Sequence, residues 1–145
     1  MIIRQLSIFA ENRPGSLARV TGILRRENIN IRATTISTSD TFGVINLIVD
    51  DPDRADEALK RAGLMVTLKN VIAVLIDDRP GGLDRLTQIL FREKININNA
   101  YGFVLESLKT AVFVVDVDQM ERAQAVIEKE GFKMLDMKTL ASLEP

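Results

Sequence analysis

The sequence contains no cysteine and no histidine among its 145 residues. Without cysteine, the chain forms no disulfide and offers neither a thiolate nucleophile nor a thiolate metal ligand. Without histidine, it lacks an imidazole general base, an imidazole metal ligand and the side chain that titrates near neutral pH. Catalysis would have to rest on arginine, asparagine and carboxylates, and the sequence shows no pairing of a nucleophile with a base. We therefore expect no catalytic residue, no metal site and no cofactor.

A charge excess and a long apolar run are also lacking. Lys plus Arg number 19 and Asp plus Glu number 20, so the net charge is −1, whereas nucleic-acid-binding surfaces usually carry a concentrated positive excess. RNA binding on a sheet also needs stacked aromatic side chains, and Phe9, Tyr101 and Phe113 are scattered. No stretch approaches the length of an apolar membrane span, and the first residues lack a leader pattern. These absences predict a cytoplasmic protein that binds neither nucleic acid nor membrane.

What the sequence does contain is an internal repeat. Residues 13–31, RPGSLARVTGILRRENINI, align without a gap with residues 79–97, RPGGLDRLTQILFREKINI, and 13 of the 19 positions are identical. The chain is therefore a duplicated unit of about 70 residues, a size at which an independent core is marginal. We expect the two units to pack on each other or on a second chain.

Both copies have the same predicted order of elements. Each Pro-Gly pair precedes an amphipathic helix, and a second helix in each copy ends at Gly63 or Gly131. Short β-branched apolar runs predict the strands, at residues 2–10, 29–38, 43–49 and 65–69, then 71–77, 95–104, 110–116 and 133–137. The order β-α-β-β-α-β, present twice, predicts an α+β protein made of two ferredoxin-like units, with antiparallel sheets and both helices on one face.

Domain boundaries follow from the repeat. We assign residues 1–69 to the first unit and 70–145 to the second. No linker separates them, so the closing strand of the first unit should run directly into the opening strand of the second. The tail KMLDMKTLASL is expected to supply one extra strand, and exchange of strands between the units stays open. Asp51 before Pro52 predicts a helix N-cap, and the spacing of Asp118 and Glu121 predicts a capping box.

The strings ENRPGSLARVTGILRRENINI and DDRPGGLDRLTQILFREKINI resemble the opening of an ACT domain, the regulatory module of many amino-acid-metabolism enzymes. The motif is Asx-x-Pro-Gly, then a helix, then Ile-Asn-Ile, and the resemblance covers essentially the whole chain as a stand-alone tandem ACT protein. It implies a non-catalytic regulatory protein that binds a small ligand, an amino acid, at the interface between ACT units. The matching ligand-binding positions are Asn12, Gly15, Ser16, Leu17, Asn30, Asp78, Gly81, Gly82, Leu83 and Asn96.

Elementary chemistry agrees with a site at this loop. Glycine lets the backbone approach a ligand, and unpaired N–H groups in the first turn of a helix suit a carboxylate. The side chains of Asn12 and Asp78 stand at the mouth of that turn and can accept from an ammonium. The alternative is that both only cap their helices. Asn30 and Asn96 are expected in mid-strand, facing away from the core, and Arg13 is expected to be a solvated loop residue.

The two copies are not equivalent. Asp78 would favour an ammonium and repel a carboxylate, and Gly82, in place of Ser16, is expected to make the second loop looser. One functional and one degenerate site is therefore an open alternative. Apolar residues on both faces of several strands, for example VFVV at 112–115, predict that an open sheet face packs in a homodimer.

Two other functions stay open at this point. The first is a regulatory subunit bound to an amino-acid biosynthetic enzyme, as the small subunit of acetolactate synthase is. This function needs the same motif. A small hydrolase on a ferredoxin-like scaffold is the less favoured alternative, since no catalytic constellation supports it.

Overall fold

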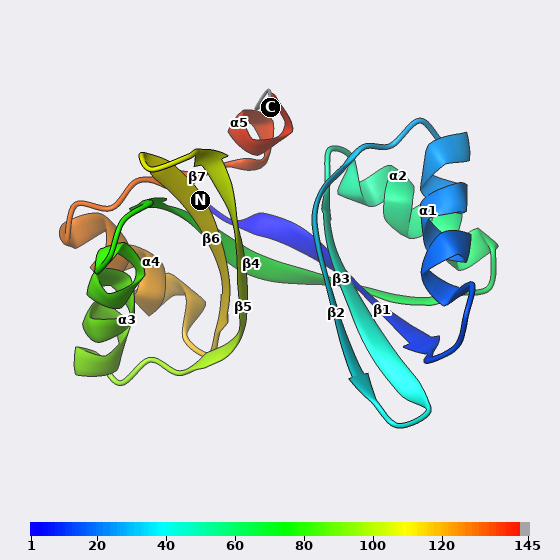
Figure 1. Ribbon diagram of the computed structural model, residues 1–145, viewed down its shortest axis with the longest axis horizontal. Helices are drawn as coiled ribbons and strands as arrows, with labels where there is room; N and C mark the ends of the chain where they lie inside the picture. Colours follow the sequence, from blue (N-terminus) through cyan, green and yellow to red (C-terminus); the bar gives the residue numbers. More distant parts are fainter. Residues whose placement is uncertain (143–145) are drawn as a thin grey trace. The chain divides into compact units, whose positions relative to one another are not determined.

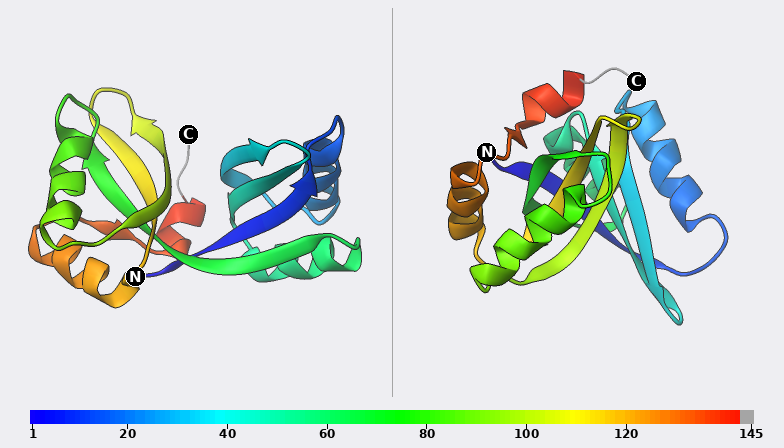
Figure 2. Two further views of the ribbon diagram at one scale, coloured as in Figure 1. Left: turned by 90° about the horizontal axis from the view of Figure 1, so that it is seen from below. Right: turned by 60° about the vertical axis from the view of Figure 1, so that its left-hand side comes forward.

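The computed structural model describes residues 1–142, and the chain folds into two compact units. The N-terminal unit is Arg4–Lys69, and the C-terminal unit is Asn70–Pro145 together with Met1–Ile3. Strand β4 (Met65–Asp77) supplies residues to both units and runs without a break, as Figure 2 shows. The expectation that the closing strand of one copy runs directly into the opening strand of the next is thus confirmed.

The N-terminal unit contains two helices and four strands. They are β1 (Ile3–Glu11), α1 (Ser16–Arg26), β2 (Ile31–Ser39), β3 (Phe42–Val49), α2 (Pro52–Arg61) and the first part of β4. The strands lie in the order β2-β3-β1-β4, and β1 and β2 both pair antiparallel with β3. Both helices lie on the same face of these strands (Figure 1). Asp51 caps α2 as expected, because its carboxylate accepts from the backbone N–H of Arg54 at 3.2 Å.

The C-terminal unit repeats this order and adds a helix. It comprises the rest of β4, α3 (Gly82–Arg92), β5 (Ile97–Glu106), β6 (Thr110–Val117), α4 (Met120–Lys129), β7 (Met134–Leu135) and α5 (Met137–Ser142). Its strands lie in the order β4-β6-β5, and β7 pairs antiparallel with β4, with Leu135 opposite Ala73. The predicted α+β fold with two βαββαβ units is confirmed.

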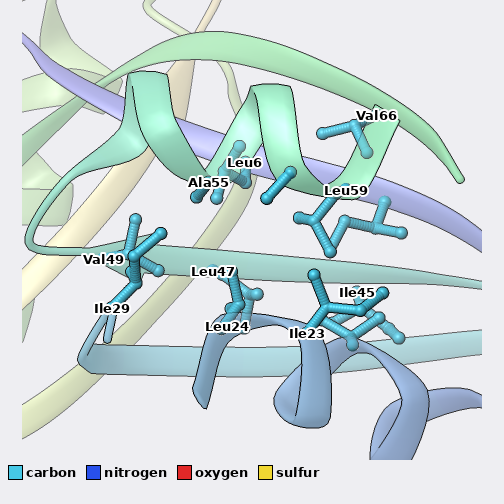
Figure 3. Close-up of a cluster of buried hydrophobic side chains, with 13 residues drawn as sticks. Leu6, Ile23, Leu24, Ile29, Ile45, Leu47, Val49, Ala55, Leu59 and Val66 are labelled. Carbon is cyan, nitrogen blue, oxygen red and sulfur yellow. The ribbon is translucent and has the colours of Figure 1, made fainter. Parts of the chain in front are cut away.

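Each unit has its own core between its sheet and its helices. In the N-terminal unit, Leu6 and Leu47 are paired across β1 and β3 and meet Leu24 of α1 and Leu59 of α2, as Figure 3 shows. Burying a side chain of this size stabilises the fold by about 1.5–3 kcal/mol. The C-terminal core is also mainly aliphatic, and Phe132 and Met134 add to a set that includes Ile72, Val74, Leu86, Leu90, Val115, Val117 and Ile127. The apolar periodicity of the sequence therefore identified the faces that are buried.

Of two local expectations, the capping box is wrong and the extra strand is shorter than expected. Gln119, not Asp118, is the N-cap of α4, and no side chain caps that helix. The carboxylate of Asp118 instead accepts from the side-chain amide of Asn98 at 2.7 Å, so the proposed capping box with Glu121 does not form. The expectation that the tail after Gly131 supplies an extra strand is confirmed, but that strand, β7, has only two residues. The chain then turns into α5, because the side chain of Asp136 accepts from the N–H of Thr139 at 2.7 Å and starts a helix there.

The apolar sheet face was the reason to expect a homodimer. Val71, Ala73, Val112 and Val114 alternate with the core positions of β4 and β6, and all four are buried within a single chain. The homodimer stays a prediction.

Candidate functional site

The two Pro-Gly loops have the same geometry in both units. Gly15 and Gly81 have φ of +91° and +87°, in the left-handed region that favours glycine, and each is the N-cap of the following helix. No side chain caps either helix, so the alternative that Asn12 and Asp78 are helix caps is wrong. The first-turn N–H groups of α1 and α3 are therefore left without a side-chain acceptor, and an anion is their natural partner.

Asn12 and Asp78 instead tie the loop to the neighbouring hairpin turn. The side-chain amide of Asn12 donates to the carbonyl of Asp40 at 3.0 Å, in the turn between β2 and β3. The carboxylate of Asp78 accepts from the N–H of Leu108 at 2.7 Å, in the turn between β5 and β6. Both side chains therefore already have a partner within their own unit. Asn12 is a donor and Asp78 is an acceptor, yet both connect the Pro-Gly loop to the hairpin turn.

The residue after each left-handed glycine differs between the copies. Ser16 donates through its hydroxyl to the carbonyl oxygen of Glu11 at 2.6 Å. A Cβ on Gly82 would lie 2.0 Å from the carbonyl oxygen of Asp77, far inside any permitted contact. The second loop is thus packed more closely against its strand than a side chain allows. The expectation that Gly82 loosens this loop is wrong, because the missing side chain is what permits the close approach.

A depression lies beside each loop. The first depression has a volume of about 710 Å³ and is lined by Phe9, Ala10, Glu11, Arg13, Pro14, Gly15, Ser16, Arg19, Phe42, Gly63, Leu64 and Met65. The second depression has a volume of about 550 Å³ and is lined by Leu75, Ile76, Asp77, Arg79, Pro80, Gly81, Gly82, Arg85, Thr110, Gly131, Phe132 and Lys133. Both volumes fall in the range of roughly 300–1,000 Å³ that small-molecule sites usually have.

An arginine from the first helix of each unit lines its depression. Arg19 donates through Nη2 to the carbonyl of Ala62 at 2.5 Å, and Arg85 donates to the carbonyl of Glu130 at 2.8 Å. Each contact connects the first helix of a unit to the end of its second helix, where unpaired carbonyls attract a cation. A guanidinium has five N–H donors, so each arginine keeps donors for a ligand. Neither arginine was among the residues predicted from the sequence, although Arg19 and Arg85 are one of the identical pairs of the repeat.

The carboxylates at the mouths of the depressions are paired with loop arginines. Arg13 lies 3.1 Å from Glu11, and Arg79 lies 3.0 Å from Asp77. These four side chains are mostly exposed, as expected for Arg13, and such pairs contribute at most about 1 kcal/mol. They can therefore exchange partners with a ligand at little cost.

Outside both depressions, burial and then the charge of Asp116 raise the pKa of Tyr101, so this phenol stays protonated.

Only part of the predicted site comes together. Gly15 and Ser16 line the first depression, and Gly81 and Gly82 line the second. Asn12 and Asp78 serve the hairpin turns, and Leu17 packs against the core rather than into the depression, while Leu83 is not among the lining residues.

The two predicted asparagines lie at the far end of the first helix of each unit. Asn30 and Asn96 stand just before β2 and β5, not in mid-strand. An 11-residue helix spans about 16 Å, so each asparagine is a helix length away from its Pro-Gly loop. The backbone N–H of Asn30 donates to Asp50, and the side chain of Asn96 donates to Asn98. A ligand in either depression would not reach them.

Residues 1–142 show neither a cluster of metal ligands nor a membrane-spanning helix. That part of the chain has no group of three or more acidic side chains that could hold a metal ion. None of its helices is long and apolar enough to cross a membrane.

The chain is similar to known proteins over its full length. A family model described as an ACT domain pair matches residues 1–144. The crystal structure of protein BT0572 from Bacteroides thetaiotaomicron superposes with a TM-score of 0.92 and 33% identity over 99% of this chain and 98% of that one. The regulatory subunit of aspartate kinase from Thermus thermophilus, in its ligand-free form, has a TM-score of 0.65 at 16% identity over 88% of this chain and 92% of that one, which is a likeness of fold alone.

A shorter match comes from the sequence of another relative. A probable acetolactate synthase small subunit of Archaeoglobus fulgidus is 35% identical over 54 residues. That match spans 36% of this chain and 34% of the relative, so about a third of each protein is compared.

Proposed function

The chain belongs to the ACT domain pair family, and from this membership we propose that it is a non-catalytic regulatory protein that binds an amino acid beside its Pro-Gly loops. The observation that carries the proposal is a set of groups that occurs twice. In each unit, the start of a helix that no side chain caps, an arginine and a carboxylate line one depression. A duplicated chain that keeps this set in both copies has the groups that recognise a zwitterion.

The proposed contacts follow from charge. The carboxylate of the ligand accepts from Arg19 or Arg85 and from N–H groups in the first turn of α1 or α3, because both are donors without a full set of acceptors. The ammonium of the ligand donates to Glu11 or Asp77. Binding at these groups favours one arrangement of the loop and its helix over others, and this difference in affinity is what a regulatory module transmits.

The rest of the proposed site is supplied by a second ACT unit, in a homodimer. Arg13, Gly15 and Arg19 are exposed, whereas small-molecule sites usually bury 70–90% of the ligand's surface. Another surface is therefore needed to enclose the ligand. Sedimentation velocity at micromolar concentration should show a dimer, at least with ligand present. A strict monomer under saturating ligand would overturn this part of the proposal.

The test of ligand binding is a thermal-shift panel of the twenty amino acids on the full chain. A ligand present at 100 times its Kd adds about 2.7 kcal/mol of stability, which raises Tm by roughly 5–11 °C for a chain of this length. Arg19→Gln and Arg85→Gln should reduce the response, because each removes the cation that faces the carboxylate. Arg26→Gln, on the same helix as Arg19 and exposed, is the matched control. If no amino acid shifts Tm, ligand sensing by these depressions is refuted.

A second candidate function is favoured by the partial match to an acetolactate synthase small subunit. In that case the chain would be the regulatory subunit of an amino-acid biosynthetic enzyme. Affinity purification of the chain from its native host should then retain a catalytic subunit in a constant ratio. Purification as the chain alone, with an intact thermal response to an amino acid, would favour the stand-alone regulator.

A further inference from the structure

The two depressions differ at the positions that surround the shared charged groups. Phe42 begins β3 and Thr110 begins β6, so these residues are equivalent. Met65 and Lys133 each stand two residues after the left-handed glycine that ends the second helix of a unit. Phe9 has Leu75 as its counterpart, by the same 66-residue shift as the repeat. An apolar rim in the first depression is thus replaced by a more polar one in the second.

The apolar rim of the first depression is exposed to solvent. Phe9 and Phe42 stack with ring centroids 5.1 Å apart and an interplanar angle of 19°, yet each is 46% exposed. Met65 is 69% exposed. None of the three belongs to the core cluster of the N-terminal unit or packs against it, whereas the lining residues Ala10 and Leu64 are partly buried against that cluster. The packing of this unit does not require them to be apolar.

The C-terminal unit is an internal control for this statement. The same fold there accommodates Thr110 and Lys133 at the corresponding positions. Its one aromatic ring at the depression, Phe132, is covered by the guanidinium of Arg85 at 4.4 Å from the ring centroid. That ring is therefore already in a cation–π contact. The fold tolerates a polar rim, and the exposed apolar rim of the first depression needs another explanation.

We propose that the first depression selects amino acids with an apolar side chain, and that Phe9, Phe42 and Met65 determine this selectivity. This selectivity rests on the proposed function. Arg19 and Glu11 hold the charged end of the ligand, and its side chain lies on the stacked rings and the methionine. The second depression, with Lys133 and Thr110 at its rim, does not share the preference. Apolar surface that is exposed in the free protein is removed from water when such a ligand binds.

The test is isothermal titration calorimetry of the full chain with leucine, phenylalanine, glycine and aspartate. Leucine or phenylalanine should bind at least ~10-fold more tightly than glycine, since removing a side chain of this size from water contributes a tenfold factor or more. The double variant Phe42→Thr and Met65→Lys places the residues of the second depression in the first. It should lower the affinity for leucine and phenylalanine about 10-fold and leave that for glycine unchanged.

A matched control is available on another surface. Phe91 is 74% exposed on α3 and lies outside both depressions, and its repeat counterpart is Arg25. Phe91→Arg should leave every affinity unchanged. Because all the substituted side chains are exposed, the variants should fold, and circular dichroism checks that they do.

The outcomes separate the two proposals. If leucine, glycine and aspartate bind with equal affinity, or if the double variant keeps the preference, the selectivity is wrong while amino-acid binding stands. If no amino acid binds, both are wrong. If the double variant changes the sedimentation coefficient but no ligand affinity, the apolar rim is a protein contact and the selectivity is again refuted.

Discussion

Gly82 lies so close to Asp77 that a Cβ on the glycine would be 2.0 Å from the carbonyl oxygen of the aspartate. The helix α3 therefore starts in direct contact with the end of β4. At the equivalent place in the N-terminal unit, the hydroxyl of Ser16 bridges to the carbonyl of Glu11. The contact between loop and strand thus occurs in both units. The C-terminal unit makes it through the backbone alone, and the N-terminal unit makes it through the side chain of Ser16.

The first prediction concerns this contact. Gly82→Ala should destabilise the chain by about 1–3 kcal/mol, because the neighbouring atom is a backbone oxygen that cannot move without shifting β4. Urea denaturation measures the change. Ser16→Ala removes only a hydrogen bond and should cost about 0.5–1.5 kcal/mol. Gly22→Ala, in the middle of α1, is the control: its Cβ meets only the end of Arg26 at 3.7 Å, and it should stabilise the chain by about 0.5–1 kcal/mol. Equal stability of Gly82→Ala and the unmodified chain would contradict the close approach.

The second prediction concerns Asp78 and the hairpin turn. Asp78→Ala should destabilise the chain by about 1–2 kcal/mol, because it leaves the N–H of Leu108 without its acceptor at 2.7 Å. Asp78→Asn should restore most of that loss, since an amide oxygen can accept the same bond. Hydrogen exchange at the amide of Leu108 gives a local readout and should accelerate in the alanine variant alone. Unchanged exchange would show that Asp78 does not hold this turn.

The third prediction compares the two arginines of the depressions. Arg19→Ala and Arg85→Ala each remove a hydrogen bond to the end of the second helix, at Ala62 and Glu130. Arg85→Ala also removes the cation–π contact with Phe132. It should therefore be more destabilising than Arg19→Ala by about 0.5–1 kcal/mol. Phe132→Leu copies Leu64 of the first unit and removes the ring. When Arg85→Ala is added to the Phe132→Leu variant, the further loss of stability should be about that of Arg19→Ala, because no cation–π contact is left to remove. The free energies of unfolding are measured in urea. If Arg19→Ala and Arg85→Ala lower them equally, the contact between Arg85 and the ring does not contribute to stability.

The fourth prediction is a pH dependence of α5. Hydrogen bonds from the backbone N–H and the side chain of Thr139, together with the nearby charge of Lys138, hold the pKa of Asp136 below its ordinary value. A carboxyl whose pKa is lowered by folding stabilises the folded form above the ordinary pKa of about 3.9, and this contribution is lost as the pH falls through the lowered pKa. Protection factors of the α5 amides, which are exchange rates corrected for the intrinsic rate at each pH, should therefore be lower at acidic pH than at neutral pH. In Asp136→Ala they should be low at both pH values, and a variant with normal protection at neutral pH would contradict the cap.

The elements of the fold were readable from local patterns. The repeat from Arg13 to Ile31 and again from Arg79 to Ile97, the apolar periodicity and the Pro-Gly and C-terminal glycines predict the order of helices and strands correctly. These signals succeed because a helix or strand is specified by side chains a few residues apart and by the faces that they bury. The capping box at Asp118 failed for the complementary reason, since the acceptor found a donor 20 residues away in Asn98.

The sequence by itself thus determined the duplicated fold, the two Pro-Gly loops and the glycines that start α1 and α3. Only the tertiary structure decided which side chains stand beside those loops. Arg19 meets Ala62 from 43 positions away, and Phe42 meets Phe9 across β1 and β3, whereas Asn30 ends up a helix length from Gly15. Spacing along the chain does not report such pairs, because they form only when the helices pack on the sheet and bring the ends of distant elements together.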